Sequence, residues 1–319
     1  MHEPLIQIKR LRKEFRIQGK KLLALQDISF TLNKGETLGL VGESGCGKST
    51  TGRCLLRLEE ATSGHVFYES KDLLTLTKKE LFAFRRSAAI IFQDPYSSLN
   101  PRMRVRDIIA EPLRIHRAME ESAIGRYLEE LVDKVALSRS SLERFPHEFS
   151  GGQRQRIGIA RAIALKPHFL VCDEPISALD VSIQAQIVNL LKDLQKELSL
   201  TILFIAHDLA MVKYISDRVA VMYLGNIVEI AAPAEALYRN PKHPYTEALL
   251  SAIPSRDPER AKAPSLTPPL KGEIPSALTP PKGCPFASRC PRAMPKCHVT
   301  PPTLQEVAPG HFAACHLHD

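Results

Sequence analysis

The sequence predicts an α/β fold in which a mainly parallel sheet presents polar loops at the ends of its strands. Short, uniformly apolar segments alternate with longer segments of helical periodicity, the pattern of buried strands joined by helices. Several of these apolar segments end abruptly in glycine or charged residues. The 319 residues, 44% of them hydrophobic, suffice for one large α/β domain and an appendage.

A glycine-rich segment is the feature around which this fold is predicted. It matches the phosphate-binding motif G-x-x-x-x-G-K-S/T through Gly42, Glu43, Ser44, Gly45, Cys46, Gly47, Lys48, Ser49 and Thr50. Thr37 to Val41 is predicted as a buried strand before it, and Thr51 to Leu58 as a helix after it. Glycines allow successive N–H groups to face an anion, and the helix dipole favours negative charge there. Lys48 would reach the β- and γ-phosphates of a nucleotide, and the Ser49 hydroxyl would bind Mg²⁺.

Two strands are predicted before this motif, over Leu5 to Phe15 and Leu22 to Leu32. Asn33 to Glu36 is a turn that leads into the strand at Thr37. Phe15 has two interpretations: it is a core residue, or it stacks on a purine ring.

A glutamine follows a further buried strand. Gly64 to Tyr68 is predicted as a short strand and Ala88 to Phe92 as a buried one, with Gln93 directly after it. Gln93 at this strand end could orient water or Mg²⁺, or it could be an ordinary loop amide.

Between Tyr96 and Phe149 the apolar residues recur at helical spacing, which indicates a helical insertion into the α/β core. A helix from about Ile157 to Leu165 follows. It is preceded by a second anion-ready segment that has no lysine, formed by Ser150, Gly151, Gly152 and Gln153. Such a segment could supplement a phosphate site, or it could be a plain helix cap.

The strand Phe169 to Glu174 ends in two acids. Asp173 is placed to hold Mg²⁺, often through water, and Glu174 can polarise an attacking water. Ser177 to Asp180 then caps a helix over Val181 to Leu198, and Asp180 is a further candidate for contact with the nucleotide.

The strand Thr201 to Ala206 is followed by His207 at the same sheet edge as Asp173 and Glu174. A γ-phosphate contact is one role for His207, and an ordinary surface or core histidine is the alternative. Arg218 to Tyr223 and Asn226 to Ile230 form a predicted hairpin.

The composition changes after Ala252. Residues 253–319 hold 14 of the 24 prolines, so we expect an irregular, loop-rich extension, with a linker over Pro254 to Pro281. Four of the seven cysteines lie in this extension: Cys284, Cys290, Cys297 and Cys315. The other three, in the core, are most simply small packed residues.

The spacing of the four cysteines, C-x5-C-x6-C-x17-C, fits neither the usual zinc pairs nor the usual ferredoxin patterns. Four thiolates in a proline-rich loop nevertheless suit a 4Fe–4S cluster, and a Zn²⁺ ion or free thiols are the alternatives. Arg289, Arg292 and Lys296 could offset the negative charge of a cluster.

The sequence also indicates where in the cell the chain is located. No apolar run approaches the 18 or so residues of a membrane span, and the first residues carry no signal-peptide core, so we expect a cytosolic or peripheral protein. The formal net charge of +8 fits a solvated surface or a modest attraction to anionic lipid headgroups. No basic run is interleaved with aromatics, so we expect no nucleic acid partner.

Taken in order, these motifs resemble those of the ATP-binding cassette (ABC) ATPases over about Leu5 to Ala252. The resemblance narrows to the dipeptide/oligopeptide importer ATPases at residues 35–50, 91–102 and 240–246, and more specifically to the second of their two ATPase subunits. The proline- and cysteine-rich tail resembles that of the same family, whose members can carry a cysteine quartet with an iron–sulfur cluster.

The resemblance implies a P-loop NTPase (RecA-like) core with an antiparallel β subdomain and an inserted helical subdomain over about 96–156. The cassette would span 1–252 and the extension 253–319. Two cassettes would sandwich ATP head to tail, so that Lys48 and Ser49 of one face Ser150 to Gly152 of the other. Glu174 would be the general base, His207 the γ-phosphate switch and Phe15 the adenine-stacking residue. Gln93 would be the sensor beside the membrane domain.

The implied partners are a paralogous ATPase subunit or a second copy, two membrane permease subunits and, indirectly, an extracytoplasmic solute-binding protein. The implied cofactors are ATP and Mg²⁺, and the implied location is the cytoplasmic face of the plasma (inner) membrane.

Three alternatives stay open. Another solute, such as nickel or glutathione, is one of them. A soluble ABC ATPase of DNA repair or translation is disfavoured, because such proteins usually carry two cassettes or a long coiled coil. A non-catalytic ATP-binding regulator is disfavoured by the intact Glu174 and His207.

Overall fold

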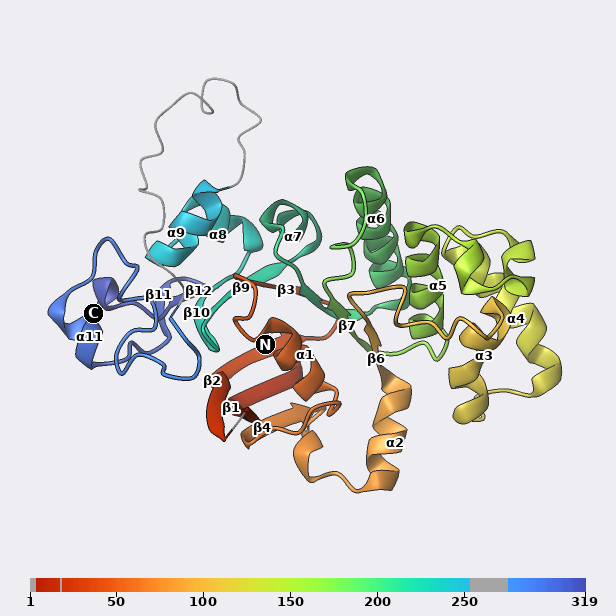
Figure 1. Cartoon of the computed structure of the whole chain (residues 1–319), viewed down its shortest axis with the longest axis horizontal. Helices are drawn as coiled ribbons and strands as arrows, with labels where there is room; N and C mark the ends of the chain where they lie inside the picture. The colour runs from red at the N-terminus through yellow and green to blue at the C-terminus, as the bar shows by residue number, and fades with distance from the viewer. Residues whose placement is uncertain (1–3, 18, 253–274) are drawn as a thin grey trace. The chain divides into compact units, whose positions relative to one another are not determined.

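The computed structural model describes residues 4–17, 19–252 and 275–319, and these form two compact units (Figure 1). Unit 1 comprises Asn33–Gly35 and Thr75–Ala206. Unit 2 comprises Pro4–Leu32, Glu36–Leu74 and the described part of His207–Asp319. Each unit has its own buried strands. No helix within the described ranges is both long and apolar enough to cross a membrane.

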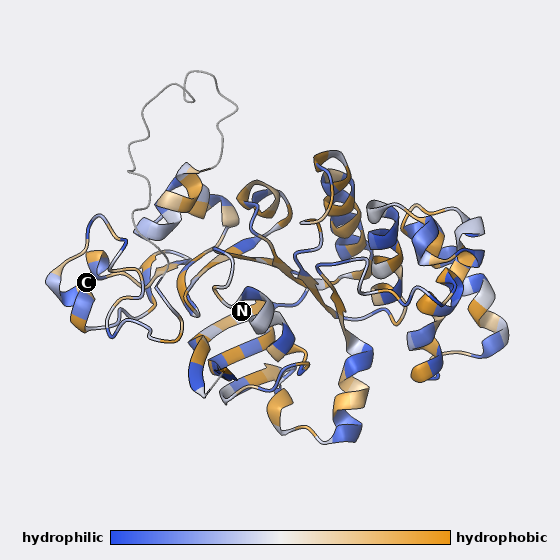
Figure 2. Ribbon diagram, viewed as in Figure 1, coloured by the Kyte–Doolittle hydropathy of each residue, from blue (hydrophilic) through white to orange (hydrophobic). Residues whose placement is uncertain are grey.

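Unit 2 contains an antiparallel sheet with the strand order β2-β1-β4-β5. Its strands are β1 (Pro4–Ile17), β2 (Lys20–Asn33), β4 (Ser63–Tyr68) and β5 (Lys71–Asp72). Strand β1 places Ile6 opposite Tyr68 and Ile8 opposite Val66 of β4. Apolar and polar residues alternate along β1 and β2, as the orange and blue bands in Figure 2 show, so one face of this sheet is buried.

A second sheet of unit 2 has the order β11-β12-β10-β9-β3. Strands β3 (Thr37–Val41) and β9 (Arg218–Tyr223) are parallel, whereas β9, β10 (Asn226–Ala231), β12 (His311–Ala313) and β11 (Gln305–Ala308) pair antiparallel. All five residues of β3 are buried, which is why its sequence is continuously apolar. The helices in the described part of unit 2 are α1 (Lys48–Leu55), α7 (Leu209–Ile215), α8 (Ala234–Arg239), α9 (Pro244–Ser251) and α11 (Pro295–Val299).

Unit 1 is built on three parallel strands in the order β8-β7-β6. They are β6 (Ala88–Ile91), β7 (Phe169–Asp173) and β8 (Thr201–Ile205), and their residues are mostly buried. The helices of this unit are α2 (Lys78–Ser87), α3 (Val105–Ile115), α4 (Glu121–Lys134), α5 (Gly151–Ile163) and α6 (Val181–Leu198). Because β6, β7 and β8 run parallel, their carboxyl ends meet at one edge.

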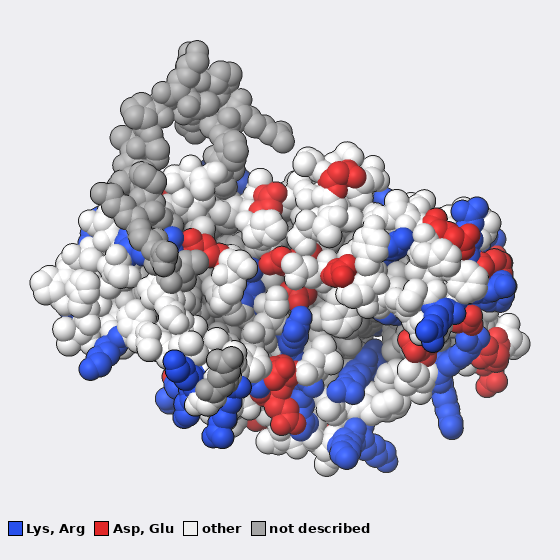
Figure 3. All heavy atoms as spheres, viewed as in Figure 1, with Lys and Arg blue, Asp and Glu red and all other residues white. Residues whose placement is uncertain are grey.

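The predicted helical insertion differs in detail from the structure. Residues 96–104 form turns and bends, because Pro95 and Pro101 oppose a helix there. Two α-helices, α3 and α4, and two short 3₁₀ turns make up the rest of the stretch to Phe149. Acidic and basic side chains are interspersed over its visible face (Figure 3), in pairs such as Arg114 with Glu121, at 2.6 Å.

The C-terminal residues are more regular than predicted. Residues 305–313 form strands β11 and β12, and β12 adds to the edge of β10 (Figure 1), with Ile230 opposite Phe312. The only proline between Gln305 and Ala313 is Pro309, which lies in the turn between the two strands. A proline-rich composition therefore did not exclude a hairpin. Most of the predicted linker, residues 253–274, lies outside the described residues.

A buried carboxylate joins this hairpin to the rest of unit 2. The Glu229 side chain on β10 is fully buried and accepts hydrogen bonds from the backbone N–H groups of Lys242 and His243, at 2.7 and 2.9 Å. The Nε2 atom of His311 on β12 lies 2.6 Å from the same carboxylate. A buried carboxyl group of this kind is tolerated because its oxygens are hydrogen-bonded.

The buried His243 makes the stability of unit 2 depend on pH. Its Nδ1 accepts the backbone N–H of Tyr245 at 3.1 Å, and burial lowers the pKa of its imidazole from 6.5 to about 4. The unfolded chain therefore binds a proton in this range that the folded chain does not. We expect the free energy of unfolding to fall by about 2 kcal/mol between about pH 7 and pH 5 through this group.

Urea unfolding of His243→Asn at both pH values tests this contribution, since asparagine retains a capping oxygen but does not titrate. The pH dependence of the variant should be weaker than that of the wild type by this amount. The exposed His298→Asn serves as the matched control and should leave the pH dependence unchanged. An equal pH dependence in the wild type and in His243→Asn would contradict the assignment.

Candidate functional site

The phosphate-binding loop of unit 2 connects β3 to α1 and depends on glycine at two positions. Gly42 has a φ of 153°, and a Cβ atom there would lie 2.1 Å from the Met222 carbonyl oxygen. Gly47 has a φ of 107°, and its Cβ would lie 2.5 Å from the carbonyl oxygen of Ala24. Strands β9 and β2 thus approach the loop so closely that any side chain at these positions would displace backbone.

Lys48, the first residue of α1, is directed back at the loop. Its side chain is only 4% exposed, and its Nζ donates hydrogen bonds to the carbonyl oxygens of Gly42 and Glu43, at 2.9 and 3.1 Å. Ser49 and Thr50 follow in the first turn of the helix. The loop, the lysine and the hydroxyls therefore form one compact group at the N-terminus of a helix, which favours a bound anion.

The acids of unit 1 lie at the carboxyl end of β7. Asp173 is the last residue of the strand and is 1% exposed. Glu174 follows with a φ of 46°, a left-handed conformation that costs a non-glycine residue energy. Its backbone N–H donates to the Ile205 carbonyl at 3.0 Å, and its carboxylate accepts a hydrogen bond from Gln93 Nε2 at 2.8 Å. The structure thus brings together two residues that are 81 positions apart in the sequence.

The second anion-ready segment caps α5. The Ser150 hydroxyl accepts the backbone N–H of Gln153 at 3.4 Å, and the Gln153 side chain accepts the backbone N–H of Ser150 at 3.1 Å. This capping box starts the helix at Gly151, six residues earlier than predicted. Gly151 is partly exposed, whereas a Cβ on the buried Gly152 would lie 2.5 Å from Cγ2 of Ile183 on α6. Close packing of α5 on α6 therefore requires a glycine at 152.

The remaining residues predicted for nucleotide contact lie on both units. Asp180 in unit 1 caps α6 by accepting the N–H of Ile183 at 3.1 Å, and a hydrogen bond from Ser182 lowers the pKa of its carboxyl group. His207 is exposed and begins the segment after β8, in unit 2. Phe15, also in unit 2, is half-buried, and the Lys13 ammonium lies 4.6 Å from the centre of its ring.

The four C-terminal cysteines lie in one neighbourhood of unit 2. The backbone N–H of Cys284 donates to the Cys297 carbonyl at 2.7 Å. Burial, and to a lesser degree the other three cysteines, raise the pKa of the Cys284 thiol to about 11. Within the described residues, however, no group of three or more His, Cys, Asp or Glu side chains is arranged to hold a metal ion. The four cysteines thus supply the sulfur atoms that a cluster needs, but their side chains are not arranged around a common metal position.

The three basic residues among these cysteines have acidic partners, which differs from the predicted role of offsetting a cluster's charge. Arg292 donates to Glu247 at 2.6 Å, and Lys296 pairs with Asp319. Arg289 donates to both carboxylate oxygens of Glu43, at 2.7 and 3.1 Å. Sequence reasoning missed the last pair, because nothing local links two residues that are 246 positions apart.

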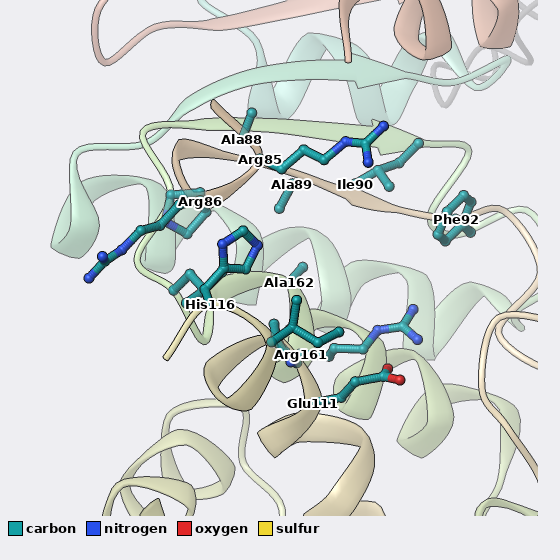
Figure 4. A pocket seen from close by; sticks show the side chains of 14 residues that line it. Arg85, Arg86, Ala88, Ala89, Ile90, Phe92, Glu111, His116, Arg161 and Ala162 are labelled. Atoms are coloured by element: carbon teal, nitrogen blue, oxygen red, sulfur yellow. The ribbon is translucent and has the colours of Figure 1, made fainter. Parts of the chain in front are cut away.

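A pocket of about 290 Å³ in unit 1 was not predicted either. It lies among the end of α2, strand β6 and helices α3 and α5, and Figure 4 shows Phe92, Glu111 and Arg161 among its lining side chains. Phe92 is 37% and Ile115 57% exposed, so two large apolar side chains are accessible at this pocket. The walls also carry the guanidinium groups of Arg85 and Arg86.

Comparisons with known proteins agree with the fold and the loop. The family described as "ABC transporter" matches residues 25–177, and the family described as "Oligopeptide/dipeptide transporter, C-terminal region" matches residues 228–297. Among solved structures, a dimer of the ATP-binding cassette MJ0796 bound to ADP and Pi superposes with a TM-score of 0.66 at 26% identity, covering 71% of this chain and 98% of that one. The chain is therefore an ATP-binding cassette protein.

Curated relatives narrow the class. YkfD of Bacillus subtilis, provisionally named an oligopeptide transport ATP-binding protein, is 56% identical over 99% of this chain and 96% of its own length. The oligopeptide transport ATP-binding protein AppF of Bacillus subtilis is 48% identical over 99% of this chain and 98% of its own. The chain belongs to the ATP-binding proteins of the oligopeptide/dipeptide transporter family. The predicted family and the predicted fold class are thereby confirmed.

Proposed function

We propose that this chain hydrolyses ATP to energise the import of di- or oligopeptides through a membrane ABC transporter, as the second of the transporter's two ATPase subunits. The observation that carries the proposal is the phosphate-binding loop between the buried strand β3 and the helix α1. In this loop the Lys48 ammonium is hydrogen-bonded to the loop carbonyls. The names of the curated relatives, which refer to peptide or oligopeptide transport, support a peptide as the solute.

Unit 2 supplies the groups that would bind the nucleotide. The loop N–H groups would surround the phosphates, and the Lys48 ammonium would neutralise charge on the β- and γ-phosphates. The Ser49 hydroxyl would bind Mg²⁺, and Phe15 would stack on the adenine. The partial exposure of Phe15 and the hydrogen-bonding capacity of Lys48 support these roles.

Unit 1 supplies the groups for hydrolysis. Asp173 would hold Mg²⁺, often through water, and Glu174 would accept a proton from the attacking water. The hydrogen bond between Gln93 and Glu174 supports a shared role in orienting that water. His207, which follows β8 in the sequence and belongs to unit 2, would contact the γ-phosphate. These assignments use the carboxyl ends of neighbouring strands, as ligand sites in parallel sheets do.

The active form would be a head-to-tail dimer with a paralogous ATPase subunit or with a second copy. Ser150, Gly151, Gly152 and Gln153 would then contact the ATP bound to the partner's loop. The capped, dipole-oriented start of α5, which has no lysine, supports a supplementary role at a phosphate site. The solved structures of the MJ0796 cassette are dimeric, which supports a dimeric form of this chain.

Glu174→Gln tests the general base. It should keep ATP binding but reduce hydrolysis on the order of 100- to 10,000-fold, because the position of the side chain survives while its basicity is lost. It should also favour an ATP-bound dimer, detectable by size-exclusion chromatography. The exposed Glu130→Gln on α4 is the matched control and should retain activity.

Hydrolysis at the wild-type rate in Glu174→Gln would remove the assignment. Lys48→Ala provides a contrasting defect: it should weaken ATP binding itself, measured by titration with a fluorescent ATP analogue.

The pocket of unit 1 supports a site for the membrane permease. We infer that a short helix from a permease subunit would dock there, since exposed Phe92 and Ile115 offer apolar contacts and the arginines offer hydrogen bonds to helix carbonyls. Phe92 directly precedes Gln93 in the sequence, so docking would couple to the hydrolytic site. The chain would accordingly sit peripherally at the cytoplasmic face of the plasma (inner) membrane.

Photocrosslinking from the pocket tests this contact. A benzoylphenylalanine introduced at Phe92 or Ile115 of the assembled transporter should crosslink to a permease subunit. The same group at the exposed Ile17 of β1 is the control and should give no such product. Crosslinks only to ribosomes or nucleic acid would overturn the transporter proposal.

We infer further that the cysteine quartet binds a 4Fe–4S cluster. The four thiols have the ligand chemistry of such a cluster and lie within electrostatic range of one another. Their side chains would have to reorient on binding, because the described residues hold no finished metal site. A metal centre would add folding energy to a segment poor in apolar residues.

Anaerobic purification tests the cluster. The protein should be brown, absorb broadly near roughly 400 nm and contain roughly four iron atoms per chain. Cys290→Ser should remove the iron, while the buried core substitution Cys54→Ala should not. ATP hydrolysis at saturating ATP should largely survive Cys290→Ser. A colourless anaerobic preparation with stoichiometric zinc would refute the iron–sulfur proposal.

A further inference from the structure

The second residue of the phosphate-binding loop is held by the C-terminal part of the chain. The Tyr245 hydroxyl accepts the backbone N–H of Glu43 at 2.9 Å. The guanidinium of Arg289 donates through both terminal nitrogens to the Glu43 carboxylate, at 2.7 and 3.1 Å. The side chains of Arg289 and Glu43 are 7% and 24% exposed, so this two-pronged ion pair is partly shielded from solvent and salt.

Arg289 itself is fixed by a cluster of aromatic rings. Its guanidinium donates to the Tyr223 hydroxyl at 3.3 Å and lies 5.8 Å from the centre of that ring. Tyr223, Tyr245 and Phe286 pack with ring centres 4.6 to 5.4 Å apart, and all three are 1% exposed or less. Arg289 therefore reaches the loop from a rigid support, with little side-chain freedom left to lose.

The C-terminal extension approaches the loop at a second place as well. A hollow of about 140 Å³ is lined by Ser44, Gly45 and Cys46 of the loop and by Pro275 and Ala277 of the extension. The Ala277 carbonyl accepts the backbone N–H of Leu23 on β2 at 3.2 Å. The extension thus lies along the side of the loop rather than touching it through one side chain alone.

The position of Glu43 also constrains the loop and the Lys48 ammonium, which would contact the phosphates. The Glu43 carbonyl accepts hydrogen bonds from Lys48 Nζ, at 3.1 Å, and from the Cys46 backbone N–H, at 3.3 Å. A shift of Glu43 would therefore move the lysine contact and the turn of the loop together. In addition, a carboxylate beside a triphosphate is repulsive unless a cation compensates it. Arg289 provides that cation without occupying the phosphate site.

We propose that Arg289 is a positioning residue for ATP binding: by holding Glu43 it keeps the phosphate-binding loop in its binding conformation, so that the C-terminal extension sets the affinity of the chain for ATP. This inference rests on the proposed function of the loop in binding ATP. It assigns to the extension a role in the nucleotide site of its own chain, separate from any metal that the cysteines hold.

The test compares ATP affinity with catalysis and stability in the full-length chain. For Arg289→Gln we expect the dissociation constant of a fluorescent ATP analogue and the KM for ATP to rise on the order of tenfold, with kcat at saturating ATP within about twofold of the wild type. Arg289→Lys should recover part of the affinity, because it keeps the charge but loses the second hydrogen bond. Arg292→Gln, which breaks an exposed ion pair on the same segment, is the control and should bind ATP like the wild type.

A double-mutant cycle identifies the partner. Glu43→Gln should weaken ATP binding through loss of the same anchor, and combining it with Arg289→Gln should add little further loss. Wild-type ATP affinity in a folded Arg289→Gln or Arg289→Lys variant, with only a lower midpoint of urea unfolding, would mean that the ion pair merely fastens the extension and would overturn the proposal. A wild-type chain that binds no ATP would instead refute the proposed function.

Discussion

The loop between β3 and α1 has its shape because no side chain projects from Gly42 or Gly47. Carbonyl oxygens of Met222 and Ala24 occupy the space that Cβ atoms would need. Strands β9 and β2 can approach this closely only because the turn is glycine, and their approach in turn prevents the loop from relaxing. The helix α1, the lysine at its start and the ion pair at Glu43 all depend on this tight arrangement.

The acidic edge of unit 1 shows a different kind of constraint. Glu174 adopts a left-handed backbone conformation that its side chain disfavours, yet two hydrogen bonds, to Ile205 through the backbone and from Gln93 to the carboxylate, hold it there. Strain of this sort persists where the surroundings over-determine the geometry. The carboxylate of Glu174 is thereby held by Gln93, whereas Asp173, one residue earlier, is buried.

Much of the fold could be predicted because it is encoded locally. The uniformly apolar strands Thr37–Val41 and Phe169–Asp173 and the glycine loop are signals contained within a few residues. The start of α5 was misplaced because two glycines disfavour a helix, whereas the Ser150–Gln153 capping box overrides that preference. Non-local features lay beyond sequence reasoning. Strand β12 pairs with β10 across 80 to 84 positions, and Arg289 pairs with Glu43 across 246, and no periodicity records such contacts.

The addition of β12 to β10 has a consequence for how this chain can be divided. A shortened chain ending near Ala252 would leave β10 as a bare sheet edge, whose unpaired N–H and C=O groups could recruit strands from neighbouring molecules. It would also remove the imidazole that meets the buried Glu229 carboxylate. The last fifteen residues thus cover the edge of β10 and the buried Glu229. A cassette trimmed to its nucleotide-binding motifs would therefore be prone to aggregate.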